Sequence, residues 1–217
     1  MKERNPYAPS FDELPKSLAV FPLTGVLLLP HGDLPLNIFE PRYIKMLDDA
    51  MAGNRMIGVI QPRQRGTDKS PLHSIGCAGK IVEFSETLDG RYVVSLKGVS
   101  RFQVTRELDV TTPYRQIKAD WSGYESDAEG ISCLDLDRER LAYLLRTYFE
   151  TQSMTCDWEK LPQVSDARLI TCLSMSCPFD PKEKQALLET SSCKERSDLF
   201  FRMIEMAIHG TCSASKH

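Results

Sequence analysis

The chain has 217 residues, 41% of them apolar and 26% charged, so it can form one large or two small domains with real cores. The formal net charge is −3, from 27 basic and 30 acidic side chains, which argues against a broad positive field for nucleic acid or anionic lipid. No apolar run approaches the roughly 18 residues of a membrane span, and residues 1–16 lack the apolar core of a secretory signal. We therefore expect a cytoplasmic protein without membrane contact, with residues 1–16 as a flexible arm.

Residues 17–121 have short apolar runs separated by glycine and proline, which are typical of a β-rich domain. Asp89-Gly90 predicts a type I′ hairpin turn, because that turn needs positive φ at both central residues, and Lys97-Gly98 predicts a second tight turn. The polar stretch 61–74 predicts an exposed loop. The expected strands cover residues 18–21, 26–29, 34–39, 56–60, 75–85, 91–97, 99–107 and 114–121.

One helix is expected within this β-rich part, over residues 41–52. Pro41 suits the first helical position, where its missing N–H is not needed, and Gly53 suits the residue after the end. Apolar residues recur at three- and four-residue steps, which predicts one stripe packed against the sheet. The stripe contains Tyr43, Ile44, Leu47, Ala50 and Met51.

The composition changes at residues 122–132, where an acidic stretch of small residues predicts a linker. Beyond it the apolar residues have helical spacing. Asp180 is expected to cap one helix, with Pro181 at its first position and Glu183 reaching back to the cap. Ser192 is expected to cap the last helix, which should end near Gly210. The expected helices cover 134–151, 164–177, a segment beginning at 181 and a segment beginning at 193.

These elements predict an α+β protein made of two parts. The expected divisions are a flexible N-terminal arm at 1–16, a β-rich subdomain at 17–121, a linker at 122–132, a helical bundle at 133–211 and a tail at 212–217.

The reactive side chains predict no catalytic, cofactor-binding or metal-binding residue. Seven cysteines are present, but none forms a Cys-x-x-Cys pair and the spacing of a zinc site is absent, so we expect reduced thiols. Nothing in the sequence places a histidine beside a cysteine. The stretch 76–80 is too short between its glycines for a phosphate-binding loop, and Ile81 after it cannot bind magnesium. We expect no cofactor.

Five separated blocks of sequence carry a resemblance to a known family. They are LAVFPLTGVLLLPHGDLPLNIFEPRY at 18–43, IGVIQ at 57–61, IGCA at 75–78, DGRYVVSLKGVSRF at 89–102 and PKEKQALLE at 181–189. The chain resembles the N-terminal domain of Lon proteases, which engages substrates. This resemblance implies a β pseudo-barrel similar to the PUA fold, followed by a helical bundle. The sequence has no ATPase or Ser-Lys peptidase part, so the chain resembles the stand-alone Lon-domain proteins of bacteria and is expected not to be an enzyme.

The resemblance implies recognition of unfolded polypeptide or of a protein partner, and the oligomeric state is left open. Apolar side chains around residues 34–43, together with an exposed strand edge, would supply the contacts. The candidate peptide-binding residues are Leu34, Leu36, Phe39, Arg42 and Tyr43.

Three other interpretations stay open at this point. The apolar candidates could instead be core, and Glu40 with Arg42 could simply form a salt-bridged corner at the start of a helix. A cryptic peptidase or hydrolase is a second possibility. An RNA-binding module is a third, suggested only by the similarity of the implied barrel to PUA domains, and the acidic net charge argues against it. The basic loop with Arg63, Arg65 and Lys69 could touch an acidic partner or RNA, or could simply be solvated.

Overall fold

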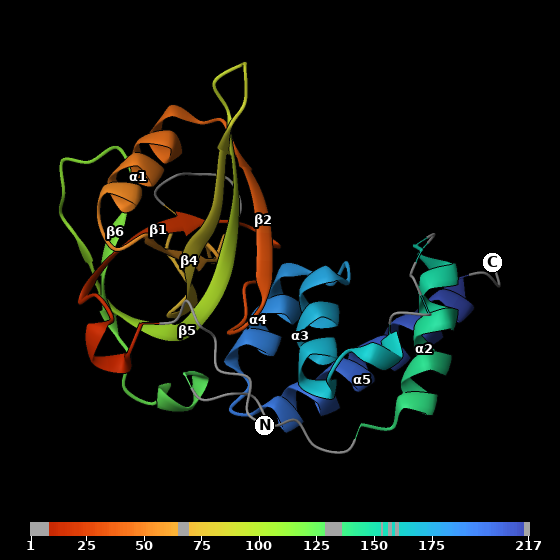
Figure 1. Cartoon of the computed structure of the whole chain (residues 1–217). Coiled ribbons are helices and arrows are strands. Elements are labelled where there is room, and N and C mark those ends of the chain that lie inside the picture. The colour runs from red at the N-terminus through yellow and green to blue at the C-terminus, as the bar shows by residue number, and fades with distance from the viewer. Residues whose placement is uncertain are drawn as a thin grey trace.

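Six strands form one sheet, and five of them close into a ring. The computed structural model describes residues 9–64, 70–128, 136–152, 154–155, 158 and 161–214. The strand order is β2-β5-β4-β3-β1-β6, and a further pairing of β5 with β6 closes the ring (Figure 1). The strands are β1 (Ser17–Pro22), β2 (Asp33–Ile38), β3 (Met56–Ile60), β4 (Ile75–Glu86), β5 (Tyr92–Leu108) and β6 (Gln116–Asp120).

The strand β2 lies outside the ring. Among the described strands it pairs with β5 alone, in antiparallel register from Asp33 opposite Lys97 to Ile38 opposite Tyr92. The long strand β5 spans 17 residues and therefore pairs with β2 and β4 near its start and with β4 and β6 near its end. One edge of β2 consequently has no neighbouring strand within the described part of the chain.

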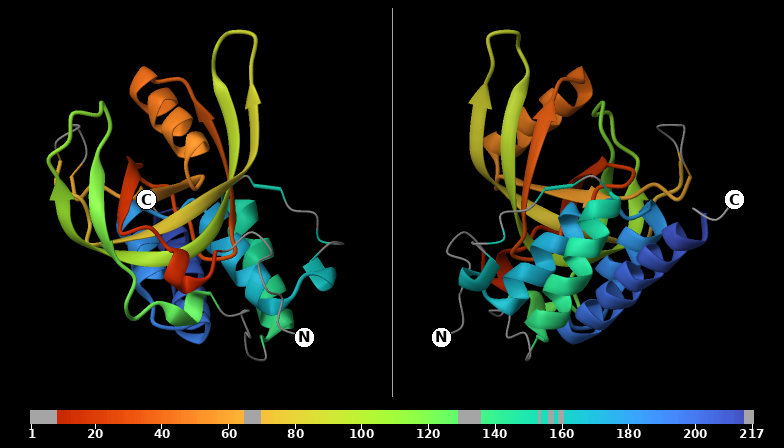
Figure 2. Two further views of the ribbon diagram at one scale, coloured as in Figure 1. Left: turned by 60° about the vertical axis from the view of Figure 1, so that its left-hand side comes forward. Right: turned by 90° about the vertical axis from the view of Figure 1, so that its right-hand side faces the viewer.

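The helix α1 (Pro41–Ala52) has the bounds that the sequence predicts. Pro41 occupies its first turn, Gly53 follows its end, and the buried side chains are Tyr43, Met46, Leu47 and Ala50. Ile44 and Met51 of the predicted stripe are only half-buried, whereas Met46, which the predicted stripe did not include, is fully buried. Both α1 and the β4–β5 hairpin lie at the end of the barrel away from the helical part (Figure 2).

In the described part of the chain, four α-helices follow the strands and pack together beside the barrel: α2 (Arg138–Thr151), α3 (Asp166–Ser176), α4 (Pro181–Glu189) and α5 (Cys193–Ala214). Two short 3-10 helices, η2 (Glu125–Asp127) and η3 (Leu161–Gln163), precede α2 and α3. Asp180 caps α4 through hydrogen bonds from Lys182 N and Glu183 N, as predicted. Ser192 Oγ accepts from Glu195 N at 3.1 Å, which confirms the predicted start of α5. The predicted end of α5 near Gly210 is wrong, since the helix continues to Ala214. The domain divisions and the likeness to the PUA fold stay predictions.

The predicted strand at 26–29 is wrong. These residues form no ladder, yet Leu27, Leu28 and Leu29 are among the most buried side chains of the protein. The segment packs across the sheet instead of pairing with it, and the Leu29 carbonyl approaches Gly98 so closely that a Cβ built there would lie 2.0 Å from the oxygen. Burial rather than strand pairing therefore explains this apolar run.

The same contact explains why the predicted turn at Lys97-Gly98 is wrong. The strand β5 continues through both residues, and glycine is required there to admit the Leu29 carbonyl. The hairpin at Asp89-Gly90 is present, but the type I′ assignment is wrong, because only Gly90 has positive φ, at 78°.

Three further expectations need correction. Part of the N-terminal arm is ordered: residues 11–13 form a short 3-10 helix (η1, Phe11–Glu13) and Leu14 is buried. The loop after β3 is not exposed throughout, since Gln61 and Ser70 are buried; its residues 65–69 lie outside the described residues. Cys193 is disulfide-bonded, which contradicts the expectation of a reduced thiol there, whereas Cys77 and Cys172 are free thiols.

Candidate functional site

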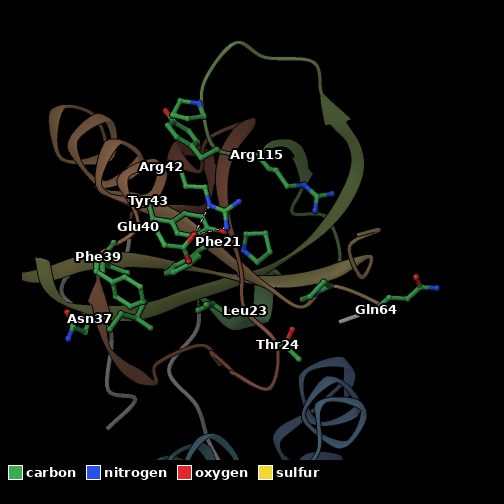
Figure 3. A pocket seen from close by; sticks show the side chains of 16 residues that line it. Phe21, Leu23, Thr24, Asn37, Phe39, Glu40, Arg42, Tyr43, Gln64 and Arg115 are labelled. Carbon is green, nitrogen blue, oxygen red and sulfur yellow. Dashed lines mark hydrogen bonds and ion pairs between the residues drawn. The ribbon is translucent and has the colours of Figure 1, made fainter. Parts of the chain in front are cut away.

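A pocket of about 530 Å³ lies where the end of β1, the end of β2 and the start of α1 meet (Figure 3). Its far wall comes from two segments distant in sequence, around residues 62–64 and 113–115. The lining residues are Phe21, Pro22, Leu23, Thr24, Leu36, Asn37, Ile38, Phe39, Glu40, Arg42, Tyr43, Pro62, Gln64, Pro113, Tyr114 and Arg115.

The first turn of α1 supplies a stacked aromatic and cationic group. Arg42 donates from Nε and Nη2 to Glu40 Oε2 at 3.0 and 2.7 Å, and its guanidinium carbon lies 4.5 Å from the centroid of the Tyr43 ring. The Tyr43 ring in turn packs on Phe21, with centroids 4.2 Å apart. Because these contacts fix its orientation, the Arg42 side chain presents a defined surface rather than a flexible one.

The opposite wall is also fixed by hydrogen bonds. Tyr114 Oη donates to Asp49 Oδ2 at 2.8 Å, and burial together with that bond raises the pKa of Tyr114 to about 12. Arg115 makes a two-point ion pair with Glu107, with both N–O distances 2.6 Å, and donates to Ser70 O at 2.8 Å. Both walls therefore hold their polar groups in place before any ligand arrives.

The structure brings four of the five candidate residues together at this pocket. Leu36, Phe39, Arg42 and Tyr43 line it, whereas Leu34 does not and is half-buried against the core. Phe39 is 63% exposed, so its ring is not part of the core, but Tyr43 is only 7% exposed and serves both as core and as pocket wall. The salt-bridged corner of Glu40 and Arg42 is also present. Whether these residues bind polypeptide stays a prediction.

Sequence reasoning missed the parts of the pocket that come from elsewhere in the chain. Phe21 belongs to the first family block, but nothing local indicates that its ring meets Tyr43. Tyr114 and Arg115 were expected only as part of a strand, although β6 begins at Gln116 and both residues precede it. No local signal in residues 113–115 places them at this pocket.

Reactive groups elsewhere offer little chemistry within the described part of the chain. Burial raises the pKa of the Cys77 thiol far above its ordinary value, so the thiolate is suppressed. His31 Nε2 lies 2.9 Å from the main-chain oxygen of Asp127, and no described set of three or more His, Cys, Asp or Glu side chains is arranged to hold a metal ion. None of the described helices has the length and apolar character needed to cross a membrane.

Comparison with known proteins gives a consistent family. The profile of the ATP-dependent protease La (LON) substrate-binding domain matches residues 17–205. The Lon protease of Flavobacterium johnsoniae is 29% identical over 193 residues, which are 86% of this chain and 23% of that protein. Lon protease 2 of Myxococcus xanthus is 25% identical over 204 residues, with 89% of this chain and 24% of that protein covered. The chain thus spans about a quarter of the length of these relatives.

Solved structures show the same fold. The Lon N-terminal domain protein from Xanthomonas campestris aligns with a TM-score of 0.61 and 22% identity, over 86% of this chain and 97% of that chain. The N-terminal domain of the Mycobacterium avium complex Lon protease aligns with a TM-score of 0.52 and 17% identity, over 89% and 98% of the two chains. The protein therefore has the Lon N-terminal domain fold, and it belongs to the family of the Lon substrate-binding domain.

Proposed function

We propose that this protein recognises polypeptide, binding unfolded segments or a protein partner at the pocket beside α1 without catalysing a reaction. The observation that supports this most strongly is Phe39, whose large aromatic side chain is 63% exposed at the rim of a pocket of about 530 Å³. An exposed aromatic ring at the rim of a concave surface is typical of a binding site, because burying the ring on a partner is favourable.

The geometry around Phe39 supports the same proposal. Arg42 is held over Tyr43 by Glu40, so little side-chain entropy would be lost when a ligand packs against it. A flexible partner must still be ordered on binding, and the contact area of one pocket is small. We therefore expect weak affinity, on the order of micromolar.

Family membership supports polypeptide as the ligand, since the matching profile is described as a substrate-binding domain.

The cytoplasm is the proposed location. A reducing cytoplasm would open the disulfide at Cys193, so the state of that thiol in cells tests this part of the proposal.

The test is a titration of a labelled, chemically unfolded polypeptide and of a labelled single-stranded RNA, each at about 50 and about 500 mM salt. Apolar contacts should persist at high salt, whereas RNA binding would weaken steeply because counterions compete for the phosphates. The Phe39→Ala variant should bind the polypeptide about tenfold more weakly. The matched control is Tyr143→Ala on α2, which removes another exposed aromatic ring, 71% exposed, away from the pocket.

Salt-sensitive RNA binding without polypeptide binding would reverse the proposal in favour of the RNA-binding alternative. Hydrolysis of casein or ATP that survives repurification would favour the enzyme alternative. If Phe39→Ala and Tyr143→Ala lost affinity for the polypeptide equally, the pocket would not be the binding site.

A further inference from the structure

The pocket lies at the end of β2, a strand whose outer edge has no neighbouring strand among the described residues. Its lining includes Leu36, Asn37, Ile38 and Phe39, which are consecutive in the chain. Successive strand residues point to opposite faces of a sheet, so a hollow under one face would touch only alternate residues. The hollow touches Leu36, Asn37 and Ile38, the last three residues of β2, and Phe39 just after them, so it lies where the strand ends rather than under one face; Figure 3 shows Asn37 and Phe39 near each other there.

The hydrogen-bond pattern of β5 shows which main-chain groups of β2 face that edge. Gly98 N donates to Gly32 O at 2.8 Å, and Thr87 N donates to Arg91 O at 2.8 Å. In an antiparallel ladder the bonded pairs alternate, so even-numbered residues of β5 bond β2 and odd-numbered residues bond β4. The even-numbered residues of β2 are therefore engaged by β5.

The odd-numbered residues of β2 point their main-chain groups outward. Asp33 and Asn37 each present one N–H and one C=O to the edge, and Pro35 presents a C=O only, because proline has no N–H. Within the described ranges no hydrogen bond engages these outward groups. This is the arrangement to which another extended chain can add.

We propose that the bound polypeptide adds to β2 as a further strand, with one apolar side chain seated in the pocket. This inference rests on the proposed function and specifies its ligand class: an extended segment of about six residues, the length of β2, rather than a helix. The two cationic lining groups are each paired with a carboxylate, Arg42 with Glu40 and Arg115 with Glu107, so the segment should carry no strong charge of either sign.

Pro35 limits this pairing. Proline in the middle of an edge strand removes one donor, which weakens uncontrolled association of the edge while leaving a reversible contact. Restoring the donor in Pro35→Ala should tighten binding of an extended peptide about two- to tenfold, the range expected for one added hydrogen bond.

The experiment uses the full chain and a fluorescein-labelled hexapeptide, Thr-Val-Phe-Glu-Val-Thr, with two backbone N-methylated forms. One form is methylated at its second, fourth and sixth residues and the other at its third and fifth. Alternate N–H groups of a strand point to the same side, so strand addition predicts that one form loses at least about tenfold in affinity while the other stays within about twofold.

The outcomes separate this inference from the proposed function. If the parent peptide binds in a Phe39-dependent way but both methylated forms bind equally well or equally poorly, strand addition is overturned and pocket binding stands. If the parent does not bind at all, both fail. A β2 edge occupied by a second copy of the chain would appear as a concentration-dependent dimer, strengthened in Pro35→Ala and indifferent to peptide, and would also overturn the inference.

Discussion

Arg101 of β5 and Asp127, in the short 3-10 helix η2 (Glu125–Asp127), form a buried two-point ion pair. Arg101 Nε lies 2.9 Å from Asp127 Oδ2 and Nη2 lies 2.8 Å from Oδ1, while both side chains are under 10% exposed. Arg101 Nη1 also donates to Leu188 O at the end of α4. Burial is the largest single influence and would lower the pKa of Arg101, but the hydrogen bond and the charge of Asp127, with smaller contributions from Cys77 and Tyr124, together raise it. The pair therefore joins the barrel, the segment after it and the helical part.

Asp127→Asn should destabilise the whole protein by about 3–5 kcal/mol, the range for breaking a buried ion pair from one side. The effect should be large because a second buried cation is near: burial, followed by the charge of Arg101, lowers the pKa of Arg196 to about 10. The loss of stability in Asp127→Asn is measured by urea denaturation followed by circular dichroism. Asp89→Asn, in the exposed pair with Arg91, is the matched control and should leave the midpoint unchanged; similar shifts in both variants would contradict this account.

Phe39→Ala should leave the stability within about 0.5 kcal/mol of the original, because the ring is mostly in solvent. Tyr43→Ala should cost about 3–5 kcal/mol, because it leaves a cavity against Phe21 and the core. Thermal or urea unfolding of the two variants checks this difference. Unfolding of the Phe39→Ala protein under native conditions would assign Phe39 to the core and remove it from the pocket rim.

Gly98→Ala should destabilise by about 1–3 kcal/mol, toward the upper end, because the new Cβ meets the Leu29 carbonyl rather than a side chain that can move. Gly53→Ala is the control, since its Cβ would meet its nearest neighbour at an ordinary 3.5 Å. Equal stability of the two variants in urea would show that the segment at 26–29 does not press against β5.

The stability should fall at high pH through Tyr114. Its folded pKa is raised to about 12 from 10.0, first by burial and then by the bond to Asp49. The folded state therefore holds the proton more tightly, and the stability from Tyr114 is complete below pH 10.0 and is lost between about pH 10 and 12. Tyr114→Phe should show a shallower decline over that window than the original protein, measured by urea midpoints at several pH values. Parallel declines would contradict the raised pKa.

Most of the helix predictions depended on residues close to the helix ends in the sequence. Pro41 and Gly53 delimit α1, and Asp180 with Glu183 form the capping box of α4, because caps depend on residues within one turn. The segment at 26–29 was mispredicted for the opposite reason. Its apolar residues satisfy a strand pattern, but contacts with residues far along the chain decide whether a buried run pairs or packs.

The pocket shows the same division between local and distant information. Leu36, Phe39, Arg42 and Tyr43 lie within eight positions of each other, and a family block pointed to them. Tyr114 joins them only because β1 lies between β3 and β6 in the sheet, and that order cannot be obtained from spacing alone.

The most direct test of polypeptide recognition is an NMR titration of the ¹⁵N-labelled full chain with an unfolded polypeptide, followed through the backbone amides. The account predicts shifts concentrated at residues 36–43 and 113–115, around the pocket, that saturate at micromolar to submillimolar concentrations. These shifts should be reduced in Phe39→Ala and unchanged in Tyr143→Ala. Shifts centred on the helices α2 to α5, or no shifts at all, would contradict it.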